Sequence, residues 1–468
     1  MSELNSVPLP EGFVSKLIEC AGEQNLLTDK NECWNYGYDN SRGHALPQAV
    51  VFATTHEQVL SIVQLCNEYN VPLTTRGRGT GTTGATVPIH GGLVLSLEKM
   101  NKILRVDPAN RLIVAQAGVT NQEVQMAAAE HGFFWPPDPT SAAFCSIGGN
   151  LAYNSAGPRA VKYGTPRDNV LGLRVVSGGG EELRAGTFTT KGVVGYDLTR
   201  LIIGSEGTLA VITEATLKLT PLPVSKRTMR VVYSDINSAS EAVASVMAQP
   251  VTPCALEFID HAAIEMIRDF SSAELPENAG ALLMIEVDGA DSAMNDAVES
   301  IHKAAQNSGL LSFDEATSAE EIAALWATRK ALSPALRKVA PKKINEDVVV
   351  PVSHIPALIN GLDKLALQHG IKIVNFGHAG NGNIHVNLLI DPDDPVQMSA
   401  AHACLDDVFT LVLKLEGSLS GEHGVGIEKR DYIVRELDKN ALKLMQSIRL
   451  QFDPNKILNQ DKTLPISA

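Results

Sequence analysis

The first half of the chain alternates short apolar runs with amphipathic segments and glycine-rich turns. Apolar residues at helical spacing predict a helix over residues 11–30. Pro47 precedes a strand-like run, AVVFA, and Thr55 can cap the helix that follows, whose inward positions are Val59, Ile62, Val63 and Cys66. Over residues 130–220, Gly and Pro separate many short β-like runs. This pattern predicts a first domain with many short strands.

After Pro223 the pattern changes to strand–helix–strand order, with helices beginning near Ser238 and Ser292. This order is typical of an α+β domain whose helices cover one antiparallel sheet. The chain from about residue 417 is glycine-rich and then helical, and we expect it to return to the first domain. The predicted organisation is an N-terminal helical segment over 1–46, a first domain over 47–222, an α+β domain over 223–416 and a C-terminal segment over 417–468.

Composition narrows the class of protein further. The 468 residues are 44% hydrophobic and 20% charged, as in an ordinary folded enzyme. The net charge of −14 argues against binding to nucleic acid, which requires clustered Lys and Arg. The six cysteines stand singly, so neither a zinc knuckle nor an iron–sulfur motif is encoded. Neither a signal peptide nor an apolar run long enough to span a membrane is evident, and we expect a cytoplasmic protein.

A glycine-rich turn is the first candidate for chemistry. Residues 76–84 read RGRGTGTTG, a segment that matches GxGxxG. A Rossmann dinucleotide site would need a helix directly after the glycines, but Pro88, Gly91 and Gly92 exclude one. What remains is a turn rich in backbone N–H donors beside two arginines. This arrangement favours binding of a pyrophosphate over the alternative, an unoccupied surface loop.

Two further glycine-rich segments follow in order. Residues 136–172 contain SIGGNLAYNSAG, and residues 202–219 contain GSEGTLAVIT. Together with PLTTRGRGTG, these motifs resemble the FAD domain of the vanillyl-alcohol-oxidase type. More narrowly they resemble the FAD-linked D-2-hydroxy-acid dehydrogenases, which include D-lactate dehydrogenase, D-2-hydroxyglutarate dehydrogenase and the flavoprotein subunit of glycolate oxidase. The resemblance extends from about residue 47 to the C-terminus. It implies an α+β protein in which an FAD-binding domain is joined to a substrate domain with an antiparallel sheet.

The resemblance also implies which residues hold the cofactor. The three glycine-rich turns would bind FAD through Arg76, Gly77, Gly79, Thr80, Gly81, Gly148, Gly149, Asn154, Gly204, Glu206, Gly207 and Thr208. Relatives that tether FAD covalently carry a histidine in the first turn, near the position of Thr80. Since no histidine lies between Arg76 and Pro88, we expect FAD to be bound without a covalent bond.

A second candidate for chemistry lies in the last quarter of the chain. Residues 372–390 read KIVNFGHAGNGNIHVNLLI, two β-like runs joined by a Gly/Asn turn. This pattern predicts a hairpin that brings His378 and His385 together. The loop SLSGEHGVG adds Glu422, and two His plus one Glu is a common catalytic zinc set with a position open for water or substrate. The alternative is a pair of surface histidines in a polar loop.

The resemblance implies roles for the residues of this second candidate. It agrees with His378, His385 and Glu422 as ligands of a divalent metal, with zinc expected. It implies that His423 is the catalytic histidine and that Asn387 lies near the substrate.

A predicted helix over residues 318–338 supplies a candidate substrate anchor. Trp326, Arg329 and Ser333 fall on one broad face of this helix. The arginine that binds the substrate carboxylate in the family matches this W-x-x-R, and Arg gives planar bidentate recognition of a carboxylate. The alternative is a solvated arginine. The family's further basic contact falls near PKKINEDVVVP, where the candidates are Lys342 and Lys343.

These assignments predict the oxidation of a small, D-lactate-like D-2-hydroxy acid to the 2-oxo acid. A metal would polarise the hydroxyl, His423 would accept its proton, and the flavin would take the hydride. The electrons would pass to an external acceptor, which could be an electron-transfer flavoprotein, a quinone or a partner subunit. The alternatives are a D-2-hydroxyglutarate dehydrogenase, a glycolate oxidase flavoprotein subunit within a larger complex, or a non-redox enzyme. The sequence leaves the oligomeric state open, a homodimer included.

Overall fold

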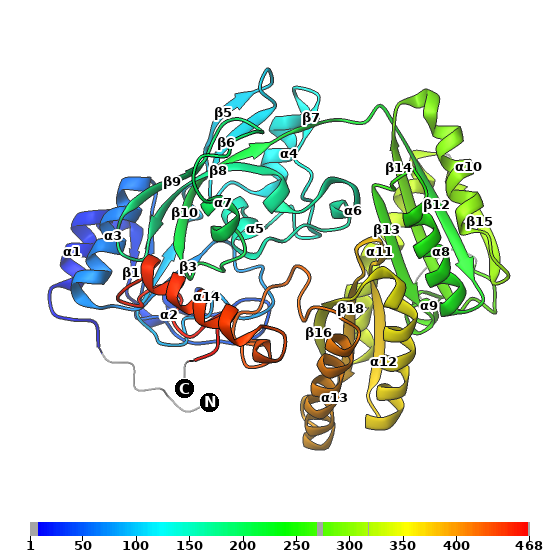
Figure 1. Cartoon of the computed structure of the whole chain (residues 1–468). Helices are drawn as coiled ribbons and strands as arrows, with labels where there is room; N and C mark the ends of the chain where they lie inside the picture. Colours follow the sequence, from blue (N-terminus) through cyan, green and yellow to red (C-terminus); the bar gives the residue numbers. More distant parts are fainter. Residues whose placement is uncertain (1–7, 269–274, 317, 467–468) are drawn as a thin grey trace. The chain divides into compact units, whose positions relative to one another are not determined.

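The computed structural model describes residues 8–268, 275–316 and 318–466; the side chains of Ser333 and some of its helical neighbours lie outside this description. The chain divides into two compact units (Figure 1). Unit 1 comprises Met1–Ala156, Gly164–Leu222 and Glu422–Ala468, and unit 2 comprises Gly157–Tyr163 and Pro223–Gly421. The chain therefore enters unit 2 twice, and its last segment returns to unit 1.

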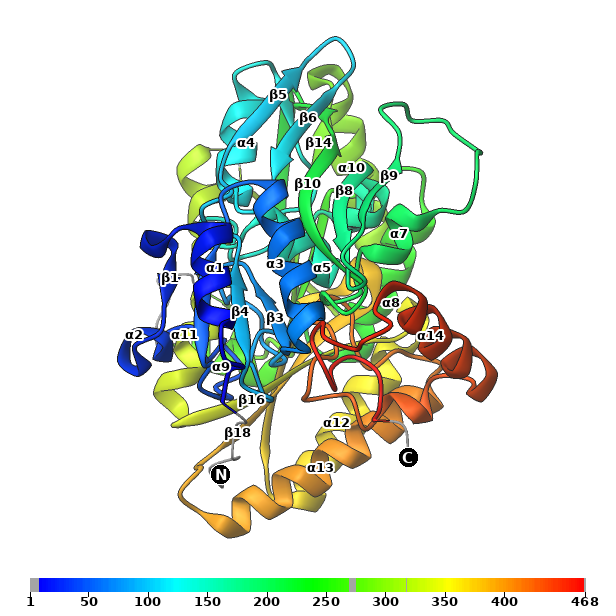
Figure 2. The ribbon, with the colours of Figure 1, turned by 90° about the vertical axis from the view of Figure 1, so that its left-hand side faces the viewer.

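Unit 1 contains two larger sheets. The first sheet has the order β1-β2-β4-β3, in which β2, β4 and β3 are parallel. The second sheet is antiparallel and has the order β5-β6-β10-β8-β9. Figure 2 shows α1 and α3 side by side, and both pack in one apolar core with the first sheet. The bounds are α1 (Phe13–Ala21), β1 (Leu26–Leu27), α2 (Lys30–Trp34), β2 (Ala49–Phe52), α3 (His56–Tyr69), β3 (Leu73–Arg76), β4 (Leu93–Ser96), β5 (Ile103–Asp107), β6 (Leu112–Gln116), α4 (Asn121–Ala129), β7 (Phe133–Phe134), α5 (Ile147–Tyr153), β8 (Val170–Ser177), β9 (Glu182–Gly186), α7 (Leu198–Ile202), β10 (Ala210–Lys218), β11 (Thr220–Pro221) and α14 (Lys439–Phe452).

The N-terminal helix is shorter than its apolar pattern predicts. α1 ends at Ala21 because Gly22 takes a φ of 84° and turns its N–H back to the carbonyl of Ile18. The chain then forms β1 and the short helix α2, so the predicted helix over residues 11–30 is wrong in its second half. The next predicted helix is confirmed, because α3 begins at His56 and Thr55 caps it by accepting a hydrogen bond from the N–H of Gln58.

Unit 2 is built on one seven-stranded antiparallel sheet with the order β15-β12-β14-β13-β17-β18-β16. Helices α8 and α10 pack on β12 and β14, α12 packs on β17, and α13 packs on β18. The bounds are α6 (Ala160–Tyr163), β12 (Ser225–Tyr233), α8 (Ile236–Ala248), β13 (Ala255–Asp260), α9 (His261–Arg268), β14 (Ala281–Gly289), α10 (Met294–Ala305), β15 (Leu310–Ala316), α11 (Ala319–Val339), β16 (Lys342–Val349), α12 (Ile355–His369), β17 (Lys372–His378), β18 (Asn383–Ile390) and α13 (Pro395–Lys414).

One face of this sheet carries a row of polar side chains. Residues paired across neighbouring strands share a face, and the observed register therefore places on one face Thr228, Glu286, Glu257, His378, His385, Asn387, Asn345 and Asp347. Helix α11 covers this face, since its Trp326 donates to Glu286 and its Arg329 donates to Glu257. We call this surface the polar sheet face.

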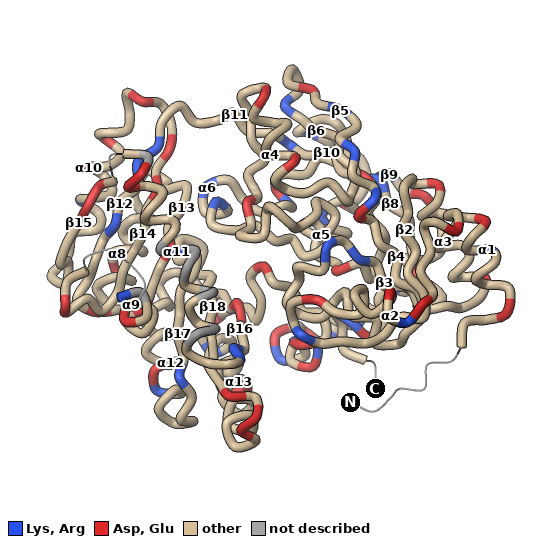
Figure 3. The backbone as a smooth tube through the Cα atoms, turned by 180° about the vertical axis from the view of Figure 1, so that it is seen from behind, with Lys and Arg blue, Asp and Glu red and all other residues tan. Residues whose placement is uncertain are grey.

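Acidic and basic positions are interspersed along both units (Figure 3). Among the described residues, no helix combines the length and the apolar character that crossing a bilayer requires.

Candidate active site

The glycine-rich turn of residues 76–84 joins β3 to β4 and borders a pocket in unit 1. The pocket lies between this turn, the start of α5 and the turn before β10. It is lined by Thr75, Gly77, Ala85, Thr86, Leu97, Ala117, Ser146, Gly148, Gly149, Ala152, Tyr153, Glu206, Gly207, Ala210, Ile212 and Asn459.

Two glycines let these segments approach one another closely. A side chain at Gly77 would collide with the hydroxyl of Ser146, the residue that caps α5. A Cβ at Gly148 would lie 2.8 Å from the Cβ of Ala117. Gly77 and Gly148 are therefore required for the close packing of these segments.

The predicted cofactor residues divide into two groups. Those that line the pocket are Gly77, Gly148, Gly149, Glu206 and Gly207. The others lie in the same turns without lining it: Arg76, Gly79, Thr80, Gly81, Asn154, Gly204 and Thr208. For these residues, contact with FAD stays a prediction.

Three residues of the second group have structural partners. Arg76 is buried, and its Nη1 donates to the carbonyl of Tyr38 at 2.5 Å. Asn154 ends α5 in the left-handed conformation, with a φ of 58°. Thr208 Oγ1 donates to the carbonyl of Ser205 at 2.7 Å. These contacts hold the turns in place.

The pocket wall offers hydrogen-bonding atoms that fit a polar cofactor. Thr75 Oγ1 and Asn459 Oδ1 are buried and have no hydrogen-bond partner within the described part of the chain. A buried polar atom without a partner is costly, so such atoms indicate a bound group that supplies one. The sequence analysis did not single out these two residues: Thr75 precedes the glycines of the first motif, and Asn459 lies far from all three motifs.

Glu206 ties the C-terminal segment to this pocket. Its carboxylate accepts hydrogen bonds from the N–H groups of Val425 and Gly426, at 2.5 and 2.7 Å, and from Thr463 Oγ1 at 2.7 Å. Burial raises the pKa of Glu206, although these donors act to lower it. The carboxylate thus accepts hydrogen bonds from the protein's own C-terminal segment, a role that the sequence did not predict.

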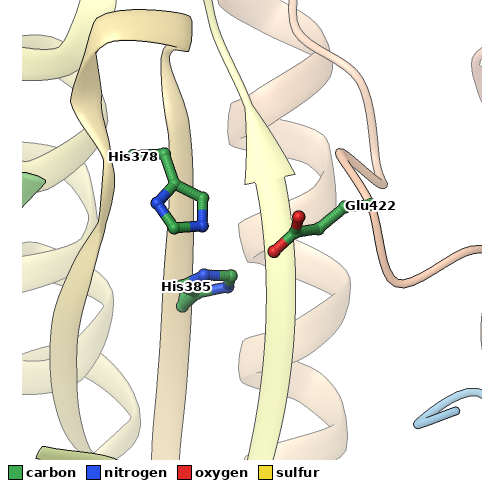
Figure 4. Close-up of side chains that lie close together, drawn as sticks. All are labelled: His378, His385 and Glu422. Atoms are coloured by element: carbon green, nitrogen blue, oxygen red, sulfur yellow. The ribbon is translucent and has the colours of Figure 1, made fainter. Parts of the chain in front are cut away.

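The second candidate, the histidine hairpin, forms in unit 2. His378 ends β17, and His385 lies near the start of β18, with ring centroids 5.2 Å apart. Possible ligand atoms of His378, His385 and Glu422 all lie within 4.8 Å of one another (Figure 4). Two imidazoles and one carboxylate form the donor set of many catalytic zinc sites, so these residues fit a divalent metal.

A buried carboxylate that the sequence analysis missed completes this region. Glu257, in β13, is 1% exposed; its Oε1 lies 2.5 Å from His378 Nδ1, and its Oε2 accepts from Arg329 Nε at 2.7 Å. The Arg329 guanidinium also packs over the ring of Phe376, 4.7 Å from its centroid. Burial acts to raise the pKa of Glu257, but the charges of His378 and Arg329 outweigh it and lower that pKa. The signal in the sequence was an acidic residue inside the apolar strand ALEFID.

The segment that carries Glu422 and His423 is anchored on both sides. On one side, buried Asp347 accepts hydrogen bonds from the N–H of Gly421 at 2.9 Å and from Ser420 Oγ at 3.1 Å. On the other, Thr83 Oγ1 donates to the carbonyl of His423 at 3.2 Å. These hydrogen bonds hold the chain on either side of Glu422. The Glu422–His423 pair therefore has a defined conformation.

The strand register separates the two candidate lysines. Lys343 pairs with Leu389 and lies on the polar sheet face, whereas Lys342 pairs with Ile390 and lies on the opposite face. Glu346 also lies on the opposite face, so it does not belong to the row that contains Asn345. The side chain of Ser333 lies outside the described residues.

Asn387, on the polar sheet face, donates through Nδ2 to the carbonyls of Val374 and His385, both at 3.1 Å. Its Oδ1 and that of Asn345, its cross-strand partner, have no hydrogen-bond partner among the residues described. This pair therefore presents two acceptor oxygens near the histidine hairpin.

Comparison with known proteins matches both halves of the chain. Residues 222–463 match the C-terminal domain of FAD linked oxidases, and residues 47–186 match an FAD binding domain. The chain is 36% identical to glycolate oxidase subunit GlcD of Bacillus subtilis, over 96% of this chain and 95% of the relative. It is 33% identical to D-lactate dehydrogenase of Anaerostipes hadrus, over 99% of both chains. The structure of p-cresol methylhydroxylase with substrate bound matches with a TM-score of 0.79 at 18% identity, over 98% of this chain and 99% of the other.

These matches confirm the predicted fold class, an α+β protein with a vanillyl-alcohol-oxidase-type FAD domain. The FAD binding domain covers the first two glycine-rich motifs, and the C-terminal domain covers the histidine hairpin. The chain therefore belongs to the FAD-linked oxidases and, as its motifs predict, to the FAD-linked D-2-hydroxy-acid dehydrogenase family.

Proposed function

We propose that this FAD-dependent hydroxy-acid dehydrogenase oxidises a short 2-hydroxy acid, D-lactate or glycolate, to the 2-oxo acid with the help of a divalent metal. The observation that carries the proposal is the convergence of His378, His385 and Glu422. When bound, FAD supplies a two-electron acceptor and the metal supplies a Lewis acid beside the substrate hydroxyl.

The chain's own residues bind the substrate and move its proton. With Arg329 Nε occupied by Glu257, a substrate carboxylate would be held through the two Nη groups. Asn387, whose buried Oδ1 has no hydrogen-bond partner among the described residues, would lie near the substrate. His423 accepts the hydroxyl proton, because imidazole is the side chain whose ordinary pKa lies nearest neutrality. The α-hydrogen leaves the substrate with its electron pair, so the substrate loses two electrons and becomes the 2-oxo acid.

The electrons must then leave the protein. None of the six cysteines belongs to an iron–sulfur motif, so we propose an external acceptor: an electron-transfer flavoprotein, a quinone or a partner subunit. The similarity to glycolate oxidase subunit GlcD favours a second candidate function, glycolate oxidation as the flavoprotein subunit of a larger complex.

The binding mode of the flavin can be tested directly. We expect the purified protein to be yellow and acid precipitation to release FAD into the supernatant, since no histidine is among the described residues that line the pocket. Absorbance of pellet and supernatant near 450 nm measures the outcome. Colour that stays in the pellet would refute non-covalent binding, and a colourless protein that cannot be reconstituted with FAD would refute the proposed function.

Removal of the metal tests the Lewis-acid role. Chelation is expected to abolish most activity and to leave FAD bound, because the histidine ligands belong to unit 2 and the pocket lining to unit 1. His385→Ala should behave like the chelated protein. His402→Ala, which removes an exposed histidine of unit 2, is the matched control and should keep full activity. Full turnover by metal-stripped protein would contradict the proposal.

A further inference from the structure

Glu257 joins two groups to which the proposed function gives different tasks. It lies on β13 directly across from His378 on β17, and this register places the two side chains on the same sheet face. One carboxylate oxygen meets His378 Nδ1, and the other meets Arg329 Nε. At 1% exposure, the carboxylate has little access to water that could replace either partner.

The first contact determines which nitrogen of His378 can bind a metal. Glu257 Oε2 forms an ion pair with Arg329, and a carboxylate in such a pair can only accept hydrogen bonds. His378 must therefore carry its hydrogen on Nδ1, which leaves the Nε2 lone pair for an ion. A carboxylate behind a metal-binding histidine fixes its tautomer and ring orientation and makes it a more basic ligand.

The second contact fixes the direction of Arg329. Its Nε is held by Glu257 while its plane lies over Phe376, so the guanidinium has a defined orientation on the polar sheet face. We infer that Glu257 is a positioning residue, which through one carboxylate sets both the metal-binding nitrogen of His378 and the orientation of Arg329. This inference rests on the proposed metal-dependent function.

The chain contains a close structural match for Glu257 that lacks both contacts. Glu286 lies on the neighbouring strand β14, is buried on the same face, and accepts hydrogen bonds from Trp326 Nε1 and Thr228 Oγ1. Both carboxylates therefore join α11 to the sheet, but the other partners of Glu286 are Lys226 and Cys254, and it contacts neither His378 nor Arg329. A purely structural role would make the two positions behave alike.

The experiment compares Glu257→Gln with Glu286→Gln in the full-length, FAD-loaded protein. Glutamine keeps the shape but has a single acceptor oxygen, so it cannot accept from His378 and Arg329 at once. We expect Glu257→Gln to weaken Zn²⁺ binding by about 10–100-fold in a competition titration with a chromophoric chelator. The same variant should raise KM, while Glu286→Gln should change the Zn²⁺ affinity less than about threefold, well below the effect of an outer-shell partner.

Glu257→Asp provides a second test if Glu257→Gln does not fold. Aspartate keeps the charge but is shorter by one methylene, so it should also bind Zn²⁺ more weakly than the unmodified protein. The inference would be overturned if a folded Glu257 variant bound Zn²⁺ as tightly as the unmodified protein, or if Glu286→Gln weakened Zn²⁺ binding equally. Neither result would contradict the metal-dependent function. Absence of Zn²⁺ binding by the unmodified protein would overturn both.

Discussion

His423→Asn is expected to lower kcat by about 10²–10⁴-fold, the range that general-base catalysis typically contributes. Asparagine preserves hydrogen bonding but cannot accept the substrate proton at neutral pH. The backbone of residue 423 is held by Thr83 through its carbonyl, so the substitution should leave the surrounding segment in place. Steady-state kinetics, together with FAD and metal content, measure the effect.

Arg329→Ala provides the contrast with His423→Asn. It should mainly raise KM, because carboxylate binding is shared by the ground state and the transition state. Since Arg329 also donates to Glu257, which contacts His378, the metal content of this variant must be measured alongside its kinetics. Equal effects of the two variants on kcat and KM, at equal metal content, would contradict this division of roles.

A short monocarboxylate should exceed D-2-hydroxyglutarate in kcat/KM by a large factor. The pair of Asn387 and Asn345 presents unpartnered acceptor oxygens on the polar sheet face, and a second carboxylate would bring only further acceptors. Asp347, on the same face, adds a negative charge. A missing charge partner in a dry pocket is worth about 2–5 kcal/mol, which corresponds to a marked preference.

Anaerobic bleaching of the flavin by D-lactate, glycolate and D-2-hydroxyglutarate, each with its L form where one exists, measures this preference. Lys343 is the basic residue that could reverse it, because it lies on the polar sheet face, whereas Lys342 does not. A clear preference for D-2-hydroxyglutarate would show that Lys343 binds the distal carboxylate. Lys343→Met should then abolish that preference, and Lys342→Met should not.

The parts of the protein predicted best from sequence are those in which the local spacing of apolar residues and the reactive residue types indicate the same structure. The hairpin with His378 and His385 follows from strand alternation around a Gly/Asn turn, and the structure contains it as β17 and β18. The α+β class follows from the order of strands and helices together with the family motifs, and the comparisons confirm it. The helix over residues 11–30 was overextended, because periodicity alone did not register the stop at Gly22.

The parts that could not be predicted depend on contacts between distant residues. Glu257 and His378 are brought together by the pairing of β13 with β17, and nothing near either residue specifies which strands pair. The family resemblance predicts Glu206 as a cofactor contact, and Glu206 lines the pocket, but the hydrogen bonds that its carboxylate accepts from Val425, Gly426 and Thr463 could not be predicted. Such partners become visible only when the chain is folded.

The return of the C-terminal segment to unit 1 sets an order of events during synthesis. Ile457 and Leu458 are fully buried in the core beneath β3, and Asn459 completes the pocket wall while its N–H bonds to the carbonyl of Leu73. A ribosome makes these residues after it has made all of unit 2. We therefore expect unit 2 to be able to fold before unit 1 is complete, and nascent chains stalled before residue 457 to be colourless because the pocket still lacks part of its wall.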